Sequence, residues 1–269
     1  MRVATRDGLS LHAEAFGEGP GLVLSCAMAT THENWRPQVE PLVAAGWRVA
    51  IWDYRGHGLS DAPEDPALYE HALVLDDLRA VIDATLGPGP AVVGGLSFGG
   101  LLSLHLALEE PERVRALVLA DTGPGFKNPK AQAGWEKQTQ RTAAFVEARG
   151  MPEFVRRAAD TLVGQNPEAP AACAAAEAIA AQSAHGVAHF ARRVAGLASP
   201  VIDRLGEVEA PALVLIGEKD EAYLRAADVL ETRLPHAERV TLAGAGHIAN
   251  LDDPAAFDAA LLAFLGKLG

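Results

Sequence analysis

A serine stands between glycines at the point where an apolar run of the sequence ends. Ser97, in "VVGGLSFGG" at residues 92–100, is the centre of a G-x-S-x-G pattern that runs from Gly95 to Gly99. Glycines on both flanks allow a sharp turn that side chains would block, and such a turn exposes a hydroxyl at the start of a helix. A serine hydroxyl attacks a carbonyl only when a base removes its proton. The pattern therefore makes Ser97 a candidate nucleophile and requires a base elsewhere in the chain.

A histidine and an aspartate follow two later apolar runs. His247 lies in "LAGAGHIANLDDP" and Asp220 in "LVLIGEKDEAY". A histidine can take the serine proton, and a carboxylate can orient the imidazole and stabilise its cation. Asp220 could instead cap a helix, His247 could be a turn residue, and Asp121, at the end of another apolar run, is a second possible acid. We predict the catalytic set Ser97, Asp220 and His247.

The elements that must position these residues alternate along the chain. Short apolar runs are separated by helix-length amphipathic segments, which predicts crossover units and a mostly parallel sheet. Residues 69–87 place Leu75, Leu78 and Ile82 on one helical face and stop at Gly87, a residue suited to a helix C-terminus. The predicted strands are "LSLHAEAF", "GLVLSC", "WRVAIWD", "PAVVGG", "VRALVLAD", "PALVLIG" and "ERVTLAG".

The alternation stops after Asp121. Residues 123–205 are rich in Ala, Arg and Glu at helical spacing and predict a helical insertion over the sheet. This segment has ten basic and seven acidic side chains, a net charge of +3, whereas the rest of the chain carries −15. A cationic insertion would favour an anionic substrate by electrostatic steering. The alternative, which we prefer, is that these charges line solvated helix faces.

Four motifs, taken together, resemble the α/β-hydrolase fold superfamily over nearly the whole chain. They are "DYRGHGLSD" at residues 53–61, "GLSFGG", "GEKD" and "GHIANLDDP", and the order Ser, Asp, His is that of the superfamily. The resemblance implies an eight-stranded, mostly parallel sheet with helices on both faces and a helical lid after the sixth strand. The core would be residues 1–122 and 206–269, with residues 123–205 as the lid. His57 would be structural, because the glycines around it describe a tight turn.

The loop after "GLVLS" departs from the common pattern of this superfamily. Many relatives have His-Gly there, where this chain has Cys26 and Ala27. The resemblance assigns one oxyanion-binding amide to Met28, or to Ala27 if the register is shifted by one. The second amide would be that of Phe98. Because the backbone donates these hydrogen bonds, the oxyanion hole can survive the replacement.

The His-less loop and "HIANLDDP" are similar to those of 3-oxoadipate enol-lactonases, which implies a small ester or lactone as the substrate. We predict a cofactor-independent serine hydrolase. The alternatives are a C–C bond hydrolase or lyase on the same triad, as in cyclohexadiene carboxylate synthase, and a non-catalytic ligand receptor. A serine rather than an aspartate at position 97 argues against dehalogenases and epoxide hydrolases of this fold.

The bulk properties exclude other classes of function. A net charge of −12 and a pI near 5.2 give no basic stripe for nucleic acid. No run approaches a membrane span or a signal sequence, and the two cysteines are far apart, so we expect a soluble, cytoplasmic protein. His185 and His189 have the spacing of helical zinc ligands, but they lack a third ligand and a glycine lies between them, so we expect no metal.

Overall fold

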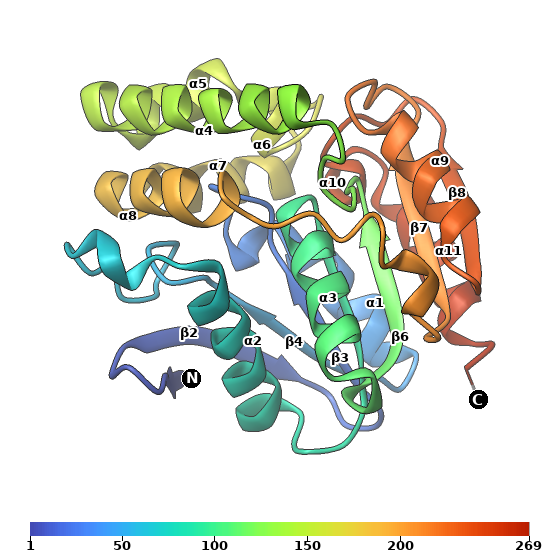
Figure 1. Ribbon diagram of the computed structural model, residues 1–269. Coiled ribbons are helices and arrows are strands. Elements are labelled where there is room, and N and C mark those ends of the chain that lie inside the picture. Colours follow the sequence, from blue (N-terminus) through green and yellow to red (C-terminus); the bar gives the residue numbers. More distant parts are fainter. Residues whose placement is uncertain (269) are drawn as a thin grey trace.

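The computed structural model describes residues 1–268, and its centre is one eight-stranded sheet (Figure 1). The strand order is β1-β2-β4-β3-β5-β6-β7-β8, in which β2 pairs antiparallel with both β1 and β4 and the other pairings are parallel. The prediction of a mostly parallel, eight-stranded sheet is confirmed. The strands are β1 (Arg2–Ala4), β2 (Ser10–Phe16), β3 (Gly21–Ser25), β4 (Arg48–Trp52), β5 (Ala91–Leu96), β6 (Val114–Ala120), β7 (Ala212–Gly217) and β8 (Ala237–Leu242).

Seven of these strands coincide with the predicted runs to within two residues. The strand β1 was not predicted, because three residues are too few to show an alternation of apolar and polar side chains. The strands β5 and β7 are buried at every position. This explains why they have no polar side chains, since both faces of the sheet are covered.

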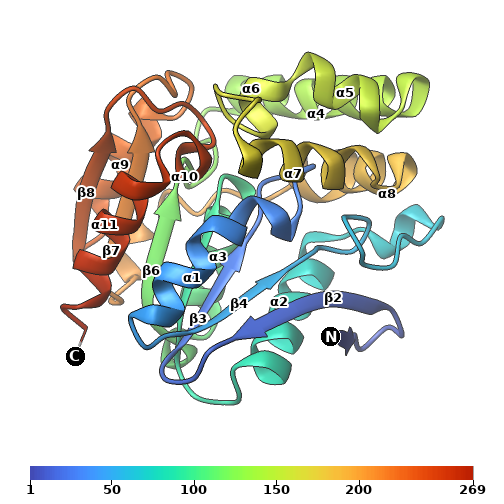
Figure 2. The ribbon, with the colours of Figure 1, turned by 180° about the vertical axis from the view of Figure 1, so that it is seen from behind.

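Successive side chains of the strands enter two apolar cores, one on each face of the sheet. In β6, Leu117 and Leu119 belong to one core and Val118 to the other, which follows from the two-residue period of a strand. The helices α2 (His71–Thr85), α3 (Phe98–Glu109) and α9 (Leu224–Arg233) contribute to the first core, and α1 (Arg36–Ala44) and α11 (Pro254–Leu265) to the second. Figures 1 and 2 show these two layers from opposite sides.

The end of α2 follows the predicted glycine. The helix stops before Gly87, which has a φ of +88° and donates its N–H to Ile82 O at 3.1 Å. A left-handed glycine closes the helix in this way without steric cost.

The chain between β6 and β7 contains helices and no strand within the described residues. Before the short helix η5 (Leu205–Glu207), they are α4 (Pro129–Arg149), α5 (Met151–Arg157), α6 (Ala159–Leu162), α7 (Pro170–Ala180), α8 (Ala184–His189) and the π-helical turn η4 (Phe190–Ala195). Figure 1 shows this layer across the end of the sheet toward which the β6 arrow points. Ligands of parallel α/β sheets bind outside the carboxyl ends of the strands, so this layer stands over the edge where a site is expected.

The connections contain short helices, namely η1 (His32–Trp35), η2 (Pro66–Leu68), η3 (Pro111–Arg113), η5 (Leu205–Glu207) and α10 (Ala249–Asp252). Among the described helices, none combines the length and the apolar character that crossing a membrane requires.

Candidate active site

The turn between β5 and α3 holds Ser97 in a backbone conformation that side chains rarely adopt. Its φ is +55° and its ψ is −113°. Two contacts fix the turn, since the Ser97 N–H donates to Ala120 O at 2.8 Å and Thr122 Oγ1 donates to the Ser97 carbonyl at 2.5 Å. A strained residue that its surroundings hold in place is typical of functional turns.

The glycines on either side of this turn leave room for the backbone of β3. A Cβ atom on Gly95 would lie 2.7 Å from Ser25 O, and one on Gly99 would lie 2.4 Å from the same oxygen. Because the obstructing atom belongs to the backbone, no side-chain rotation could relieve either contact. The G-x-S-x-G spacing is therefore required by the close approach of three segments.

The loops after β7 and β8 bring Asp220 and His247 together. His247 Nδ1 lies 2.7 Å from Asp220 Oδ2. The Asp220 side chain is 6% exposed and that of His247 is 16% exposed, so the pair is shielded while the imidazole still reaches a cavity. With Nδ1 engaged by the carboxylate, Nε2 is the nitrogen left for proton transfer.

Asp121, the other candidate acid, has a different environment. It is fully buried with a φ of +44°, and its carboxylate accepts hydrogen bonds from Gly217 N at 2.8 Å and Ala249 N at 3.4 Å. Burial raises its pKa well above the ordinary value. These contacts join β6 to β7 and α10, which is a structural task.

The loop after β3, in which Cys26 and Ala27 replace the His-Gly of many relatives, is held in place by a buried histidine. Ala29 has a φ of +67°, and its N–H donates to His57 Nε2 at 3.0 Å. Burial lowers the pKa of His57 to about 4, so at neutral pH its imidazole is uncharged and can accept this hydrogen bond. His57 thus anchors the loop that presents Ala27 and Met28.

One pocket of about 620 Å³ collects all of the residues predicted to act on a substrate. Its walls are mostly apolar, and Phe126 and Trp135 from the segment between β6 and β7 contribute rings. A smaller cavity of about 450 Å³ shares Asp220 and His247 with it. The predicted residues that line the larger pocket are Ala27, Met28, Ser97, Phe98, Asp220 and His247.

The comparison with known proteins decides the family, because the model of the alpha/beta hydrolase fold matches residues 20–254. The chain belongs to the α/β-hydrolase fold family. RutD of Variovorax paradoxus, whose name describes it as a carbamate hydrolase, is 32% identical over 97% of this chain and 97% of its own length. A 3-oxoadipate enol-lactonase of Acinetobacter baylyi is 26% identical over 96% of this chain and 93% of its own.

A solved hydrolase from Pseudomonas aeruginosa has a TM-score of 0.85 at 31% identity, covering 99% of this chain and 98% of its own. The resemblance inferred from the motifs is confirmed. These three relatives are hydrolases, and the chain is an enzyme of this kind.

Tyr223 is a pocket residue of this hydrolase that the sequence reasoning missed. Its ring stacks on that of His247 with centroids 4.9 Å apart and an interplanar angle of 27°. Burial raises the pKa of Tyr223, and a hydrogen bond with the Ser97 side chain opposes that rise. The only signal in the sequence is its place three residues after Asp220 in "DEAY".

The basic residues between β6 and β7 do not line the larger pocket. None of its lining residues in the described chain is Lys or Arg. Several basic side chains of the segment form ion pairs at the surface, namely Lys127–Asp203, Arg156–Glu153, Arg192–Glu147 and Arg204–Glu207. These four of the ten basic side chains of the segment are thus engaged in surface ion pairs, which favours charges on solvated helix faces over charges that contact a substrate.

His185 and His189 lie on α8 with ring centroids 6.2 Å apart. His185 contacts the hydroxyl of Ser183 and the carbonyl of Ala62, at 2.9 Å each. Through these contacts His185, at the surface, joins α8 to the loop that contains Ala62.

Proposed function

We propose that this hydrolase cleaves a small ester or lactone through a covalent acyl-enzyme on Ser97. The observation that carries the proposal is the 2.7 Å contact between His247 Nδ1 and Asp220 Oδ2, in the pocket that the strained Ser97 also lines. Asp220 is preferred to Asp121 as the acid, because the Asp121 carboxylate is engaged by backbone N–H groups.

The acylation step begins when His247 Nε2 takes the proton of Ser97 Oγ as that oxygen bonds to the substrate carbonyl carbon. The carbonyl oxygen becomes an oxyanion, which the N–H groups of Met28 and Phe98 stabilise, with Ala27 as the alternative to Met28. Asp220 holds the imidazole in place and stabilises its positive charge. The oxyanion then collapses, the C–O bond to the leaving alcohol breaks, and His247 gives that alcohol its proton.

Deacylation uses the same groups in reverse. His247 takes a proton from water, whose oxygen bonds to the acyl carbon, and the proton returns to Ser97 Oγ as the acid leaves. Every proton is accounted for by the chain and water, so the mechanism requires no cofactor. Residues 123–205 would be the lid over a core formed by residues 1–122 and 206–269.

The pocket walls support the proposed substrate class. A mostly apolar pocket of about 620 Å³ suits a small substrate with an apolar acyl or alcohol part. An anionic substrate stays a prediction, to which the walls add no cationic contact among the described residues. A carbamate is a second ligand to assay, because RutD carries that activity in its name and the same attack applies to a carbamate carbonyl.

A fluorophosphonate probe tests the proposal directly, because an activated serine is the side chain that attacks phosphorus rapidly at neutral pH. Intact mass spectrometry should show one adduct on the native protein. Ser97→Ala should abolish the adduct, whereas Ser199→Ala, at an exposed serine after η4, should leave it unchanged.

A panel of aryl esters, lactones, aryl carbamates and 1,3-diketones then distinguishes the reaction classes. Turnover of an ester or lactone, with a trapped acyl group on Ser97, is the expected result. Turnover of the diketone alone would favour the C–C hydrolase. Labelling that persists in Ser97→Ala would remove the nucleophile from the proposal, and the absence of turnover on every substrate would favour the receptor.

A further inference from the structure

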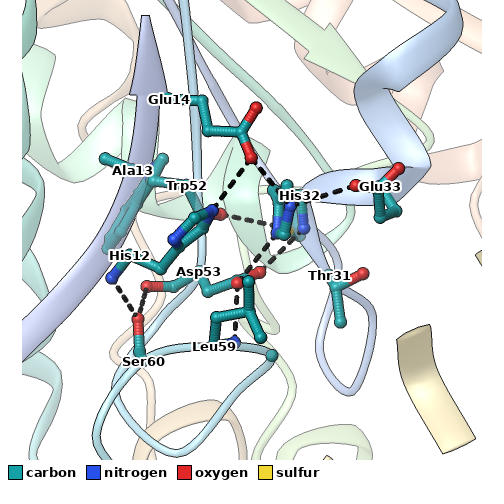
Figure 3. Close-up of polar contacts among 12 residues, drawn as sticks. His12, Ala13, Glu14, Thr31, His32, Glu33, Trp52, Asp53, Leu59 and Ser60 are labelled. Carbon is teal, nitrogen blue, oxygen red and sulfur yellow. Dashed lines mark hydrogen bonds and ion pairs between the residues drawn. The ribbon is translucent and has the colours of Figure 1, made fainter. Parts of the chain in front are cut away.

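Two histidines and a glutamate meet at the edge of the sheet, among residues that do not line the pocket. His12 and Glu14 are two residues apart on β2, so their side chains point to the same face, opposite the buried Leu11 and Ala13. His32 begins η1 and approaches them from the other side (Figure 3). Their side-chain exposures are 14% for His12, 26% for Glu14 and 4% for His32, which makes a partly enclosed cluster.

The atoms that meet are those that a metal ion would bind. His12 Nε2 lies 3.0 Å from Glu14 Oε1, and His32 Nε2 lies 3.4 Å from the same oxygen. All three ligand atoms lie within 4.8 Å of one another. Bonds of about 2.0–2.1 Å in a tetrahedral zinc site place neighbouring ligand atoms about 3.3 Å apart. The two distances to Glu14 Oε1 are close to that edge length, and the two Nε2 atoms lie within 4.8 Å of each other.

A second ring of contacts orients two of these ligands. His32 Nδ1 lies 2.8 Å from Oδ2 of the fully buried Asp53, which leaves Nε2 directed toward Glu14. Arg36 Nη1 donates to Glu14 Oε2 at 2.7 Å, which leaves Oε1 directed toward the histidines. Carboxylates behind the ligating histidine and hydrogen bonds behind the ligating carboxylate are what metal sites use to fix their ligands.

The charges around the cluster favour a cation. Glu14, Glu33 and Asp53 supply three carboxylates, and Glu33 Oε1 also lies 3.2 Å from His32 Nε2. Against them stands Arg36, which pairs with both glutamates. With neutral imidazoles the group therefore has a net charge of −2. A divalent ion balances that charge.

We propose that His12 Nε2, Glu14 Oε1 and His32 Nε2 bind a divalent transition-metal ion of the zinc class, with water in the fourth position. Two nitrogen ligands select against Ca²⁺ and Mg²⁺, which take oxygen ligands. Each imidazole enters the site neutral, with its one hydrogen on Nδ1 and the lone pair of Nε2 on the ion, and any second proton that it carried is released to solvent. The ion would join β2 to η1, directly after the loop that presents Met28, and would thereby stabilise that loop. This site departs from the sequence-based expectation of no metal and does not depend on the proposed function.

Zinc and cobalt titrations of the full chain test the site. The parent protein should be Cys173→Ser, because the exposed thiol of Cys173 offers zinc an unrelated ligand. After removal of metals with EDTA and transfer to chelator-free buffer, calorimetry should show one zinc ion bound per chain. Cobalt should give the visible absorption of a tetrahedral site, and the melting temperature should rise with zinc.

His12→Gln and Glu14→Gln lie at partly exposed positions of β2 and should fold, as circular dichroism would verify. Each should weaken zinc binding at least about tenfold and abolish the cobalt absorption. His32→Gln should do the same if it folds, but the two β2 variants decide the outcome without it.

His185→Gln is the matched control, because it removes a histidine from a different histidine pair, His185 and His189. It should leave the zinc affinity unchanged. Zinc binding that survives in both β2 variants, or that is lost only in His185→Gln, would overturn the proposal. The absence of binding to the parent at 100 micromolar zinc would do so as well, and the cluster would then be a hydrogen-bonded network around a protonated His32.

Discussion

Replacing His57 by glutamine should make the stability of this hydrolase less sensitive to acid. The imidazole is fully buried, its Nε2 accepts the Ala29 N–H at 3.0 Å, and its ring packs against Tyr54 and Phe190. Burial lowers its pKa from 6.5 to about 4 in the folded protein. Glutamine does not titrate, and its side-chain oxygen can accept the same hydrogen bond.

The magnitude follows from the difference in pKa between the two states. Below pH 6.5 the unfolded chain binds a proton at His57 that the folded protein does not bind until about pH 4. The free energy of unfolding therefore falls as the pH falls through this window. At about 1.4 kcal/mol per pKa unit, the full loss is about 3 kcal/mol, and the part that falls between pH 7 and pH 5 is about 2 kcal/mol.

Urea unfolding at pH 7 and pH 5 measures this loss. The native protein should lose about 2 kcal/mol more between these pH values than His57→Gln does, although the variant is less stable at pH 7 because it lacks the ring contacts. The contributions of other titrating groups are shared and cancel in the difference. His236→Gln, at an exposed histidine, should behave as the native protein does. Equal losses in the native protein and in His57→Gln would refute a buried, uncharged His57.

Three further outcomes are expected. Asp220→Asn should lower kcat about a thousandfold or more on whichever ester is turned over, whereas Asp121→Asn should mainly lower the urea midpoint; the reverse ranking would reassign the acid. Gly99→Ala should destabilise the protein by about 2 kcal/mol or more in urea, because its Cβ would lie 2.4 Å from a backbone oxygen of β3. Gly134→Ala, in open space on α4, should instead stabilise it slightly, and equal effects would contradict the steric argument. Tyr223→Ala should lower kcat by about two- to tenfold through loss of the ring stack. Tyr223→Phe keeps the ring and should retain most of the native kcat; equal losses of kcat in both variants would mean that the hydroxyl, and not the ring stack, is responsible.

The sequence by itself determined the order of the elements and the family. Strands such as β5 and β7 are runs without polar residues, and helices such as α2 repeat their apolar residues every three to four positions. These patterns are local, because each reflects the geometry of one element against one core. The turn at Ser97 could also be predicted from the sequence, because a tight turn requires glycine at positions next to it in the chain.

Only the tertiary structure decided which side chains meet. Asp121 and Asp220 follow neighbouring strands and look alike in the sequence, but the Asp121 carboxylate meets backbone N–H groups and that of Asp220 meets His247. Tyr223 acquires its contact with His247 in the same way. The cluster of His12, Glu14 and His32 could not be predicted either, because 17 residues lie between its last two members. Such contacts depend on how segments that are distant in the sequence pack together. No local periodicity predicts which side chains of two such segments will meet.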